Sequence, residues 1–134
     1  MDLEEQLFAL WRVPPSTHDD AEAAFRRVYA DPVLINGTPM TVAALVARAA
    51  ALHTAFTEHD IEIVDRVQVP GKLTVAFRHR AKHTGLWSTP LGELPPTGRV
   101  VQGLGIDVLT VGEDGRITGI WVLADELQRI LQVR

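Results

Sequence analysis

The sequence of 134 residues contains no cysteine. This absence excludes disulfide bonds, thiolate metal ligands and a cysteine nucleophile, and it is compatible with a reducing compartment. Long apolar runs are also missing, because the most apolar segment, 41–56, is interrupted by Arg48 and His53 and is too short to span a bilayer. The acidic start MDLEEQLFALW has no basic stretch before an apolar core. We therefore expect a cytoplasmic protein with no signal peptide and no membrane partner.

Neither sign of charge dominates the chain. It has 13 Lys and Arg against 17 Asp and Glu, scattered among one another, and a net charge of −4. Without a basic patch, a nucleic acid is not an expected partner. Hydrophobic residues make up 46% of the chain, which is enough for the core of one domain covering 1–134.

The hydrophobic pattern changes from helical to strand-like after the first 57 residues. Apolar spacings of three and four predict helices over 3–11, 21–29 and 41–56. Period-two alternation predicts strands over 61–69, 73–83, 100–111 and 116–124, followed by a short helix over 125–132. The predicted fold class is α+β, with a curved, mostly antiparallel sheet wrapped around the N-terminal helices. Such a shape can enclose an apolar pocket.

Two predicted strands place polar side chains on otherwise apolar faces. In 73–83, His79 and His83 share a face with Phe77, but they lie about 13 Å apart along the strand, too far to share a metal ion. We predict no metal site. Asp107 stands in a strand almost free of charge and shares its face with Gly103 and Gly105. Either that face meets solvent, or Asp107 points into a cavity; the glycines favour the cavity, because glycine marks bends and close approaches in strands.

The segment 82–99 is too long for an ordinary hairpin turn. It carries four large apolar side chains and three prolines, and Thr84-Gly85 and Thr97-Gly98 are possible hinges. We expect it to fold over the sheet as a cavity rim or as a contact between two copies.

Four stretches together resemble a known family: YADPVLINGTP, AFTEHDIEI, KHTG with LPPTGR, and DGRITGIWVLADELQRILQV. From about Tyr29 onward the chain is similar to the SnoaL-like polyketide cyclase and ester cyclase group of the nuclear transport factor 2-like superfamily. The resemblance implies a cone-shaped α+β barrel around an apolar cavity, usually in a homodimer. It also implies cyclisation of an aromatic polyketide ester by an intramolecular aldol step, with no metal or organic cofactor.

The resemblance also suggests which residues form the site. His83 falls at the family's His-Thr-Gly position. Where relatives often read His-Trp-Asp with a second Asp three residues later, this chain has Ile120-Trp121-Val122 and keeps Asp125. Together with Asp107, which the strand pattern favours, the expected catalytic residues are His83, Asp107 and Asp125. The expected ligand-binding residues are Trp121, Tyr29, His53, His79, Phe77 and Trp87.

Several of these residues also have a structural interpretation. His83 can be a core histidine, and Asp125 can be the N-cap of the last helix. The predicted function is that of a cofactor-independent cyclase that acts by acid/base chemistry on a hydrophobic, aromatic or polyketide-like small molecule. Because Val122 replaces the usual acid, a non-catalytic binding protein with the same cavity is the alternative. Epoxide hydrolysis ranks lower, because no arginine lies two residues from Asp107.

Overall fold

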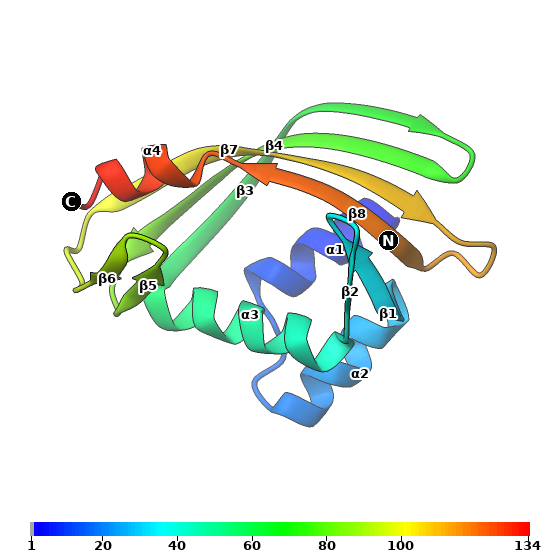
Figure 1. Ribbon diagram of the computed structural model, residues 1–134, viewed down its shortest axis with the longest axis horizontal. Helices are drawn as coiled ribbons and strands as arrows, with labels where there is room; N and C mark the ends of the chain where they lie inside the picture. Colours follow the sequence, from blue (N-terminus) through cyan, green and yellow to red (C-terminus); the bar gives the residue numbers. More distant parts are fainter. Residues whose placement is uncertain (1) are drawn as a thin grey trace.

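Residues 2–134 are described by a computed structural model and form four helices and eight strands. The helices are α1 (Leu3–Arg12), α2 (His18–Val28), α3 (Val42–Ala55) and α4 (Glu126–Leu131). The strands are β1 (Tyr29–Ile35), β2 (Thr38–Met40), β3 (Phe56–Val69), β4 (Lys72–His83), β5 (Trp87–Thr89), β6 (Gly92–Leu94), β7 (Val100–Val111) and β8 (Ile117–Ala124). Figure 1 shows their arrangement.

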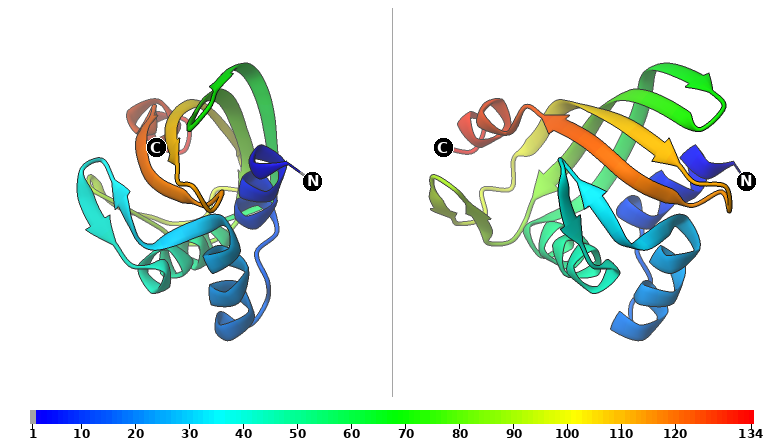
Figure 2. Two further views of the ribbon diagram at one scale, coloured as in Figure 1. Left: turned by 90° about the vertical axis from the view of Figure 1, so that its right-hand side faces the viewer. Right: turned by 45° about the vertical axis from the view of Figure 1, so that its right-hand side comes forward.

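Six strands form one curved sheet in the order β2-β1-β8-β7-β4-β3. All neighbours are antiparallel except β1 and β8, which are parallel. The sheet arches over α1 and α3, while α4 and the β5–β6 hairpin lie together at one end (Figures 1 and 2). The predicted α+β class with a curved, mostly antiparallel sheet is confirmed.

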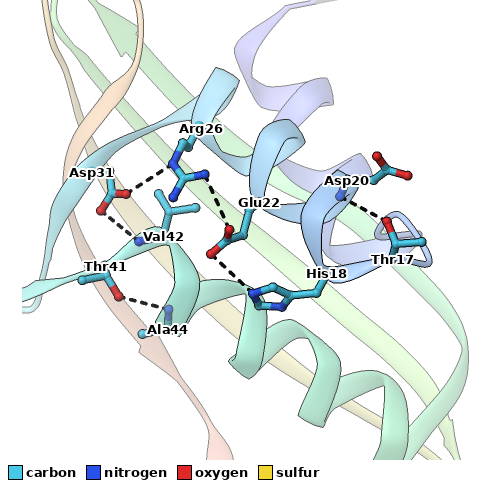
Figure 3. A network of polar contacts seen from close by, with 9 residues as sticks. All are labelled: Thr17, His18, Asp20, Glu22, Arg26, Asp31, Thr41, Val42 and Ala44. Atoms are coloured by element: carbon cyan, nitrogen blue, oxygen red, sulfur yellow. Dashed lines mark hydrogen bonds and ion pairs between the residues drawn. The ribbon is translucent and has the colours of Figure 1, made fainter.

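Local polar contacts fix where α2 and α3 begin. Thr17 and Thr41 cap these helices, each with its hydroxyl accepting a backbone N–H three residues ahead. Asp31 joins the two elements, because one carboxylate oxygen accepts the Val42 N–H at 3.1 Å and the other pairs with Arg26 at 3.4 Å (Figure 3). These contacts connect α2 to β1 and to the start of α3.

The inner face of the sheet follows the predicted alternation. In β4 the inward residues include Val75, Phe77 and His79, and in β7 they include Asp107, while the arginines of β4 point outward. The inner face packs on α1, α2 and α3 in the larger hydrophobic cluster. A smaller cluster joins Trp87 of β5, Phe56 of β3 and Ile130 of α4 at the opposite end.

Two parts of the chain differ from the predicted boundaries. β3 begins at Phe56 rather than at residue 61, and it contains a bulge between Thr57 and Asp60, where Glu58 has a positive φ of 55°. The segment 82–99, for which no strand was predicted beyond residue 83, contains the β5–β6 hairpin, with Trp87 opposite Leu94. Trp87 is buried, whereas Leu86 and Leu91 stay exposed.

Candidate functional site

Asp107 lies on the inner face of β7 with only 9% of its surface exposed. Its ladder partners are Val75 on β4 and Val122 on β8, so apolar side chains flank it on both sides. Burial raises the pKa of Asp107 to about 6, and no described residue from 2 to 134 offsets this by donating a hydrogen bond to its carboxylate. The group therefore changes protonation state close to neutral pH, which suits a general acid or base.

Tyr29, the only tyrosine, lies in the same part of the interior. Its hydroxyl oxygen accepts a hydrogen bond from the Trp11 indole at 2.7 Å, and its side chain is fully buried. Burial raises the pKa of the Tyr29 phenol above its usual value, and the charge of Asp107 adds to this rise. Tyr29 therefore stays protonated and keeps its own proton available as a donor.

His59 and His79 form a hydrogen-bonded pair farther along the inner face. His59 Nε2 lies 3.0 Å from the Phe56 carbonyl oxygen, which can only accept, so this nitrogen carries the proton of the neutral ring. His59 Nδ1 must then accept from His79 Nε2 at 3.0 Å. The last nitrogen, His79 Nδ1, faces an Arg129 N–H at 3.5 Å. The contacts thus fix one tautomer for each ring.

Both histidines of this pair remain neutral at physiological pH. Burial lowers the pKa of His79 to about 3, and the nearby charge of Arg129 contributes. Burial likewise lowers the pKa of His59, followed by the effect of His53. The pair can therefore transmit hydrogen bonding, but neither ring is a strong base.

His53 lies at the edge of the helical layer, beside this pair. Its Nε2 donates to the Trp11 carbonyl at 2.7 Å, and its ring centroid lies 4.1 Å from that of His59. It also lines two open recesses near the linker between α1 and α2, one of about 470 Å³ and one of about 400 Å³. His59 lines the smaller recess, so that recess reaches the histidine pair from outside.

Phe77 separates Asp107 from the histidine pair. Its ring covers Gly105, where an added Cβ would overlap the ring, and it packs edge-on against Phe8 at 5.2 Å. Although they face inward, some side chains on this part of the sheet stay partly accessible; they include Phe77, His79 and Val122. The concave face is therefore not completely filled by the helices.

His83 belongs to the smaller hydrophobic cluster and is fully buried. Its Nδ1 lies 3.1 Å from the Thr97 hydroxyl, and its ring lies 5.4 Å from that of Phe56 and 5.9 Å from that of Trp87. Its Nε2 has no partner among the described residues. These surroundings fit the structural interpretation of His83 as a core histidine. The backbone of His83 is also hydrogen-bonded to Gly98 and Arg99, at the end of the segment 82–99.

Two expected site residues point away from the interior. Trp121 is 60% exposed on the outer face, because Ile120 and Val122 on either side of it face inward. This corrects the expectation that Trp121 forms a pocket wall. Asp125 is exposed and caps α4, with its carboxylate accepting the Gln128 N–H at 3.3 Å. Its structural interpretation therefore accounts for its position.

Sequence reasoning missed His59 and Arg129. His59 fell in the unassigned stretch before residue 61, although counting back by two from the inward Ile61 reaches it. Arg129 lies in a six-residue helix whose buried side is set by contact with the sheet, and the sequence pattern of so short a helix does not reveal that side.

The described part of the chain offers no obvious place for a metal or a membrane span. Among residues 2–134, no group of three or more His, Asp or Glu side chains is arranged to hold a metal ion. None of the described helices has the length and the apolar run needed to cross a membrane.

Comparisons with known proteins agree on the fold. A family model described as SnoaL-like polyketide cyclase matches residues 9–133. A SnoaL-like polyketide cyclase from Agrobacterium tumefaciens has a similar structure, with a TM-score of 0.72 and 16% identity over 100% of this chain and 99% of that one. So does TsrD from Streptomyces laurentii, with a TM-score of 0.76 and 14% identity over 98% and 91% of the two chains.

A third similar structure is AclR from Streptomyces galilaeus, a candidate hydroxylase. Its TM-score is 0.74 at 14% identity, over 98% of this chain and 92% of that one. At such identities the likeness demonstrates a shared fold and leaves the reaction open. A search of curated protein sequences finds no significant match.

Proposed function

The chain belongs to the SnoaL-like polyketide cyclase family, and we propose that it is a cofactor-independent cyclase that uses Asp107 as its base. The observation that carries this proposal is a carboxylate on the concave face whose pKa burial raises to about 6. The substrate would be a hydrophobic ester with an aromatic or polyketide-like skeleton, bound on the inner face of the sheet.

The chemistry requires a base of this kind. Asp107 would remove a proton from a carbon next to a carbonyl, and the resulting enolate would attack a second carbonyl of the same molecule to form the new carbon–carbon bond. The alkoxide formed would take the proton back from Asp107, so no atom is gained or lost. A carboxylate with an ordinary pKa near 4 would be a weaker base for this step than one near 6.

The position of Asp107 would also compensate for Val122. The family resemblance places an acid at residue 122, and the ladder pairs Val122 with Asp107 on the neighbouring strand. Both side chains face inward, so a carboxylate on β7 would reach much of the space that one on β8 would reach. Tyr29 would support the base indirectly, because its buried phenol, held by Trp11, keeps the surroundings of Asp107 in place.

The alternative is a binding protein without catalysis. It is favoured by Val122 and by the use of Asp125 as a helix cap, which leaves Asp107 as the one inward carboxylate among these candidates. We leave His83 out of the mechanism because its surroundings are those of a core side chain. The two readings differ in one measurable property, which is turnover that depends on Asp107.

The test measures cyclisation of a panel of aromatic poly-β-keto methyl esters by absorbance and chromatography. We expect Asp107→Asn to lower kcat by about 10²- to 10⁴-fold, in line with loss of a general base. In the wild type, kcat should rise with pH through about 6, because the base must be ionised. Asp114→Asn, in an exposed turn, serves as the control and should leave kcat unchanged. Equal turnover in Asp107→Asn and the wild type would contradict the proposal.

A further inference from the structure

Arg129 is a charged side chain held in the interior by a short helix. Only 9% of its surface is exposed, although α4 has just six residues. Its aliphatic stem occupies the space over Gly103, where an added Cβ would come within 2.7 Å of the Arg129 Cγ. The absence of a side chain at residue 103 thus provides the room that lets the guanidinium reach the inner face.

The guanidinium has fewer partners than its donors require. One terminal nitrogen pairs with Glu126 at 3.3 Å, and the other makes the long contact of 3.5 Å with His79. The Nε–H is buried and has no hydrogen-bond partner among the described residues. Burial lowers the pKa of Arg129, but an arginine stays charged in proteins. A buried cation with unused donors is costly unless an anion or a polar oxygen meets it.

The surroundings of Arg129 suit a flat ligand. Its guanidinium carbon lies 5.4 Å from the Phe56 ring centroid and 5.5 Å from that of Trp87, so aromatic faces hold its plane. The neighbouring His79 and His59 rings lie edge to edge and nearly parallel, with centroids 5.2 Å apart and planes 10° apart, as their hydrogen bond requires. Because both rings are neutral, they add hydrogen-bonding capacity without a second charge.

Asp107 and Arg129 lie toward the two ends of one strip of the inner face. Four residues of β7 separate Asp107 from Gly103, which corresponds to about 13 Å along the strand. Phe77 lies between them with its ring over Gly105, and this ring stays partly accessible. A flat molecule lying across Phe77 could therefore meet the carboxylate at one end and the guanidinium near the other.

We propose that Arg129 binds an oxyanion of the ligand, that is, a carboxylate, phenolate or enolate oxygen carried by a flat ring system. The unused Nε–H and the weakly engaged Nη2 provide a fork of donors that matches such an oxygen. Glu126 competes for the same guanidinium from its exposed side. The inference deepens the proposed function, from which it takes the position of the ligand on the inner face.

Binding of two matched probes tests this assignment. 2-Naphthoate and 2-naphthamide share one flat ring system and differ in charge, and their dissociation constants can be measured by calorimetry. The wild type should bind the carboxylate about tenfold more tightly than the amide, a preference of about 1.4 kcal/mol. In Arg129→Gln the ratio of the two dissociation constants should fall to about one. Arg129→Lys should keep part of the preference, because the charge remains while the fork of donors is lost.

Glu126→Gln tests the same site without altering the buried side chain. By removing the competing carboxylate it should tighten 2-naphthoate about two- to threefold and leave 2-naphthamide unchanged. Arg27→Gln removes an exposed positive charge on α2 and should change neither constant. The comparison of Glu126→Gln with Arg27→Gln remains informative if Arg129→Gln fails to fold.

Three results would overturn the proposal: no preference for 2-naphthoate in the wild type, including no binding of either probe; a preference retained in Arg129→Gln; or weaker 2-naphthoate binding in Glu126→Gln. The outcome is separable from that for the cyclase chemistry. Asp107→Asn should keep the preference for 2-naphthoate even though it loses turnover, and a failure to find turnover would leave the binding result standing.

Discussion

Asp107 owes its raised pKa to the same burial that makes its charged form unfavourable. The unfolded chain exposes this carboxyl to water, where its pKa is 3.8, while burial in the fold raises the pKa to about 6. Between these two values the folded state binds more protons than the unfolded state, so the contribution of Asp107 to the free energy of unfolding falls as pH rises. Above about pH 6 the folded protein carries the full cost of a buried charge.

Replacing Asp107 with Asn should therefore stabilise the protein above pH 6. The amide has nearly the same shape and no charge, so the free energy of unfolding should rise by up to about 3 kcal/mol at pH 7, with the difference from wild type disappearing below about pH 4. Urea denaturation followed by circular dichroism at several pH values measures this difference.

Asp114→Asn is the matched control for that experiment. The Asp114 carboxylate accepts hydrogen bonds from the Arg116 backbone and side chain, which lower its pKa. The pKa of Asp114 is shifted in the opposite direction from that of Asp107, so we expect that Asp114→Asn does not stabilise the protein above pH 6. If Asp107→Asn were no more stable than wild type at pH 7, Asp107 would not be an unfavourable buried charge, and its role as a tuned base would lose its physical basis.

At the scale of single elements, strand alternation was the most predictable property of this chain. The bounds of β7 agree with the predicted range, and period two placed His79 and His83 on the apolar face of their strand. For Asp107 the alternation left two sides open, and the glycines of its face favoured the interior, where Asp107 lies. The start of β3 was not predictable in this way, because the bulge at Glu58 shifts the phase between Phe56 and Ile61. His59 therefore lay outside the predicted strand, although it is in phase with Ile61 and completes the histidine pair.

The start of α2 was less predictable than the strands. The helix begins at His18 rather than at residue 21, because the Thr17 hydroxyl accepts the Asp20 N–H and caps it. The outward side of Trp121 follows from the alternation of β8, in which Ile120 and Val122 face inward. The orientation of Arg129 depends on how α4 meets the sheet, and such a tertiary contact leaves no periodic signal in a helix of six residues. This explains why that part of the candidate site was less predictable than the sheet.

The segment 82–99 is held against the end of α3 near its start. The backbone N–H groups of Thr84 and Gly85 both donate to the Ala55 carbonyl at 3.0 Å. A Cβ at residue 85 would overlap the Thr54 carbonyl oxygen, and this oxygen belongs to the backbone and cannot rotate away. Glycine at this position therefore allows the segment 82–99 to approach α3 and to bury Trp87.

Substituting Gly85 with Ala should open this junction. We expect a loss of about 1 to 3 kcal/mol in the free energy of unfolding, as for other overpacked sites. A changed emission spectrum of Trp87 should accompany it. Ser88→Ala, at an exposed position of β5, is the control and should change stability by less than about 0.5 kcal/mol. An unchanged stability in Gly85→Ala would show that the junction is loose.

At the scale of the whole molecule, the two faces of the sheet carry different kinds of side chain. The concave face carries the buried polar groups, whereas the convex face of β7 and β8 presents large apolar side chains to solvent. These exposed residues are Leu104, Ile106, Trp121 and Leu123. On the neighbouring β4 most outward positions are basic, with Arg78 opposite Leu104 in the ladder. An apolar centre beside a polar border is the usual pattern of a protein interface.

We propose that this convex face binds a second copy of the chain, as the family resemblance leads one to expect. Placing a charge at its centre should then separate the copies. Leu123→Lys should reduce the mass in solution from about twice 14.8 kDa to that of one chain, as measured by size-exclusion chromatography with light scattering. Because Leu123 is exposed in the single chain, the substitution should leave folding nearly unchanged. Val13→Lys, at the exposed end of α1 in the helical layer on the concave side of the sheet, introduces the same charge away from this face and should keep the mass of two chains. A wild-type protein that is monomeric at micromolar concentration, or a Leu123→Lys variant that stays dimeric, would show that the apolar convex face has another role.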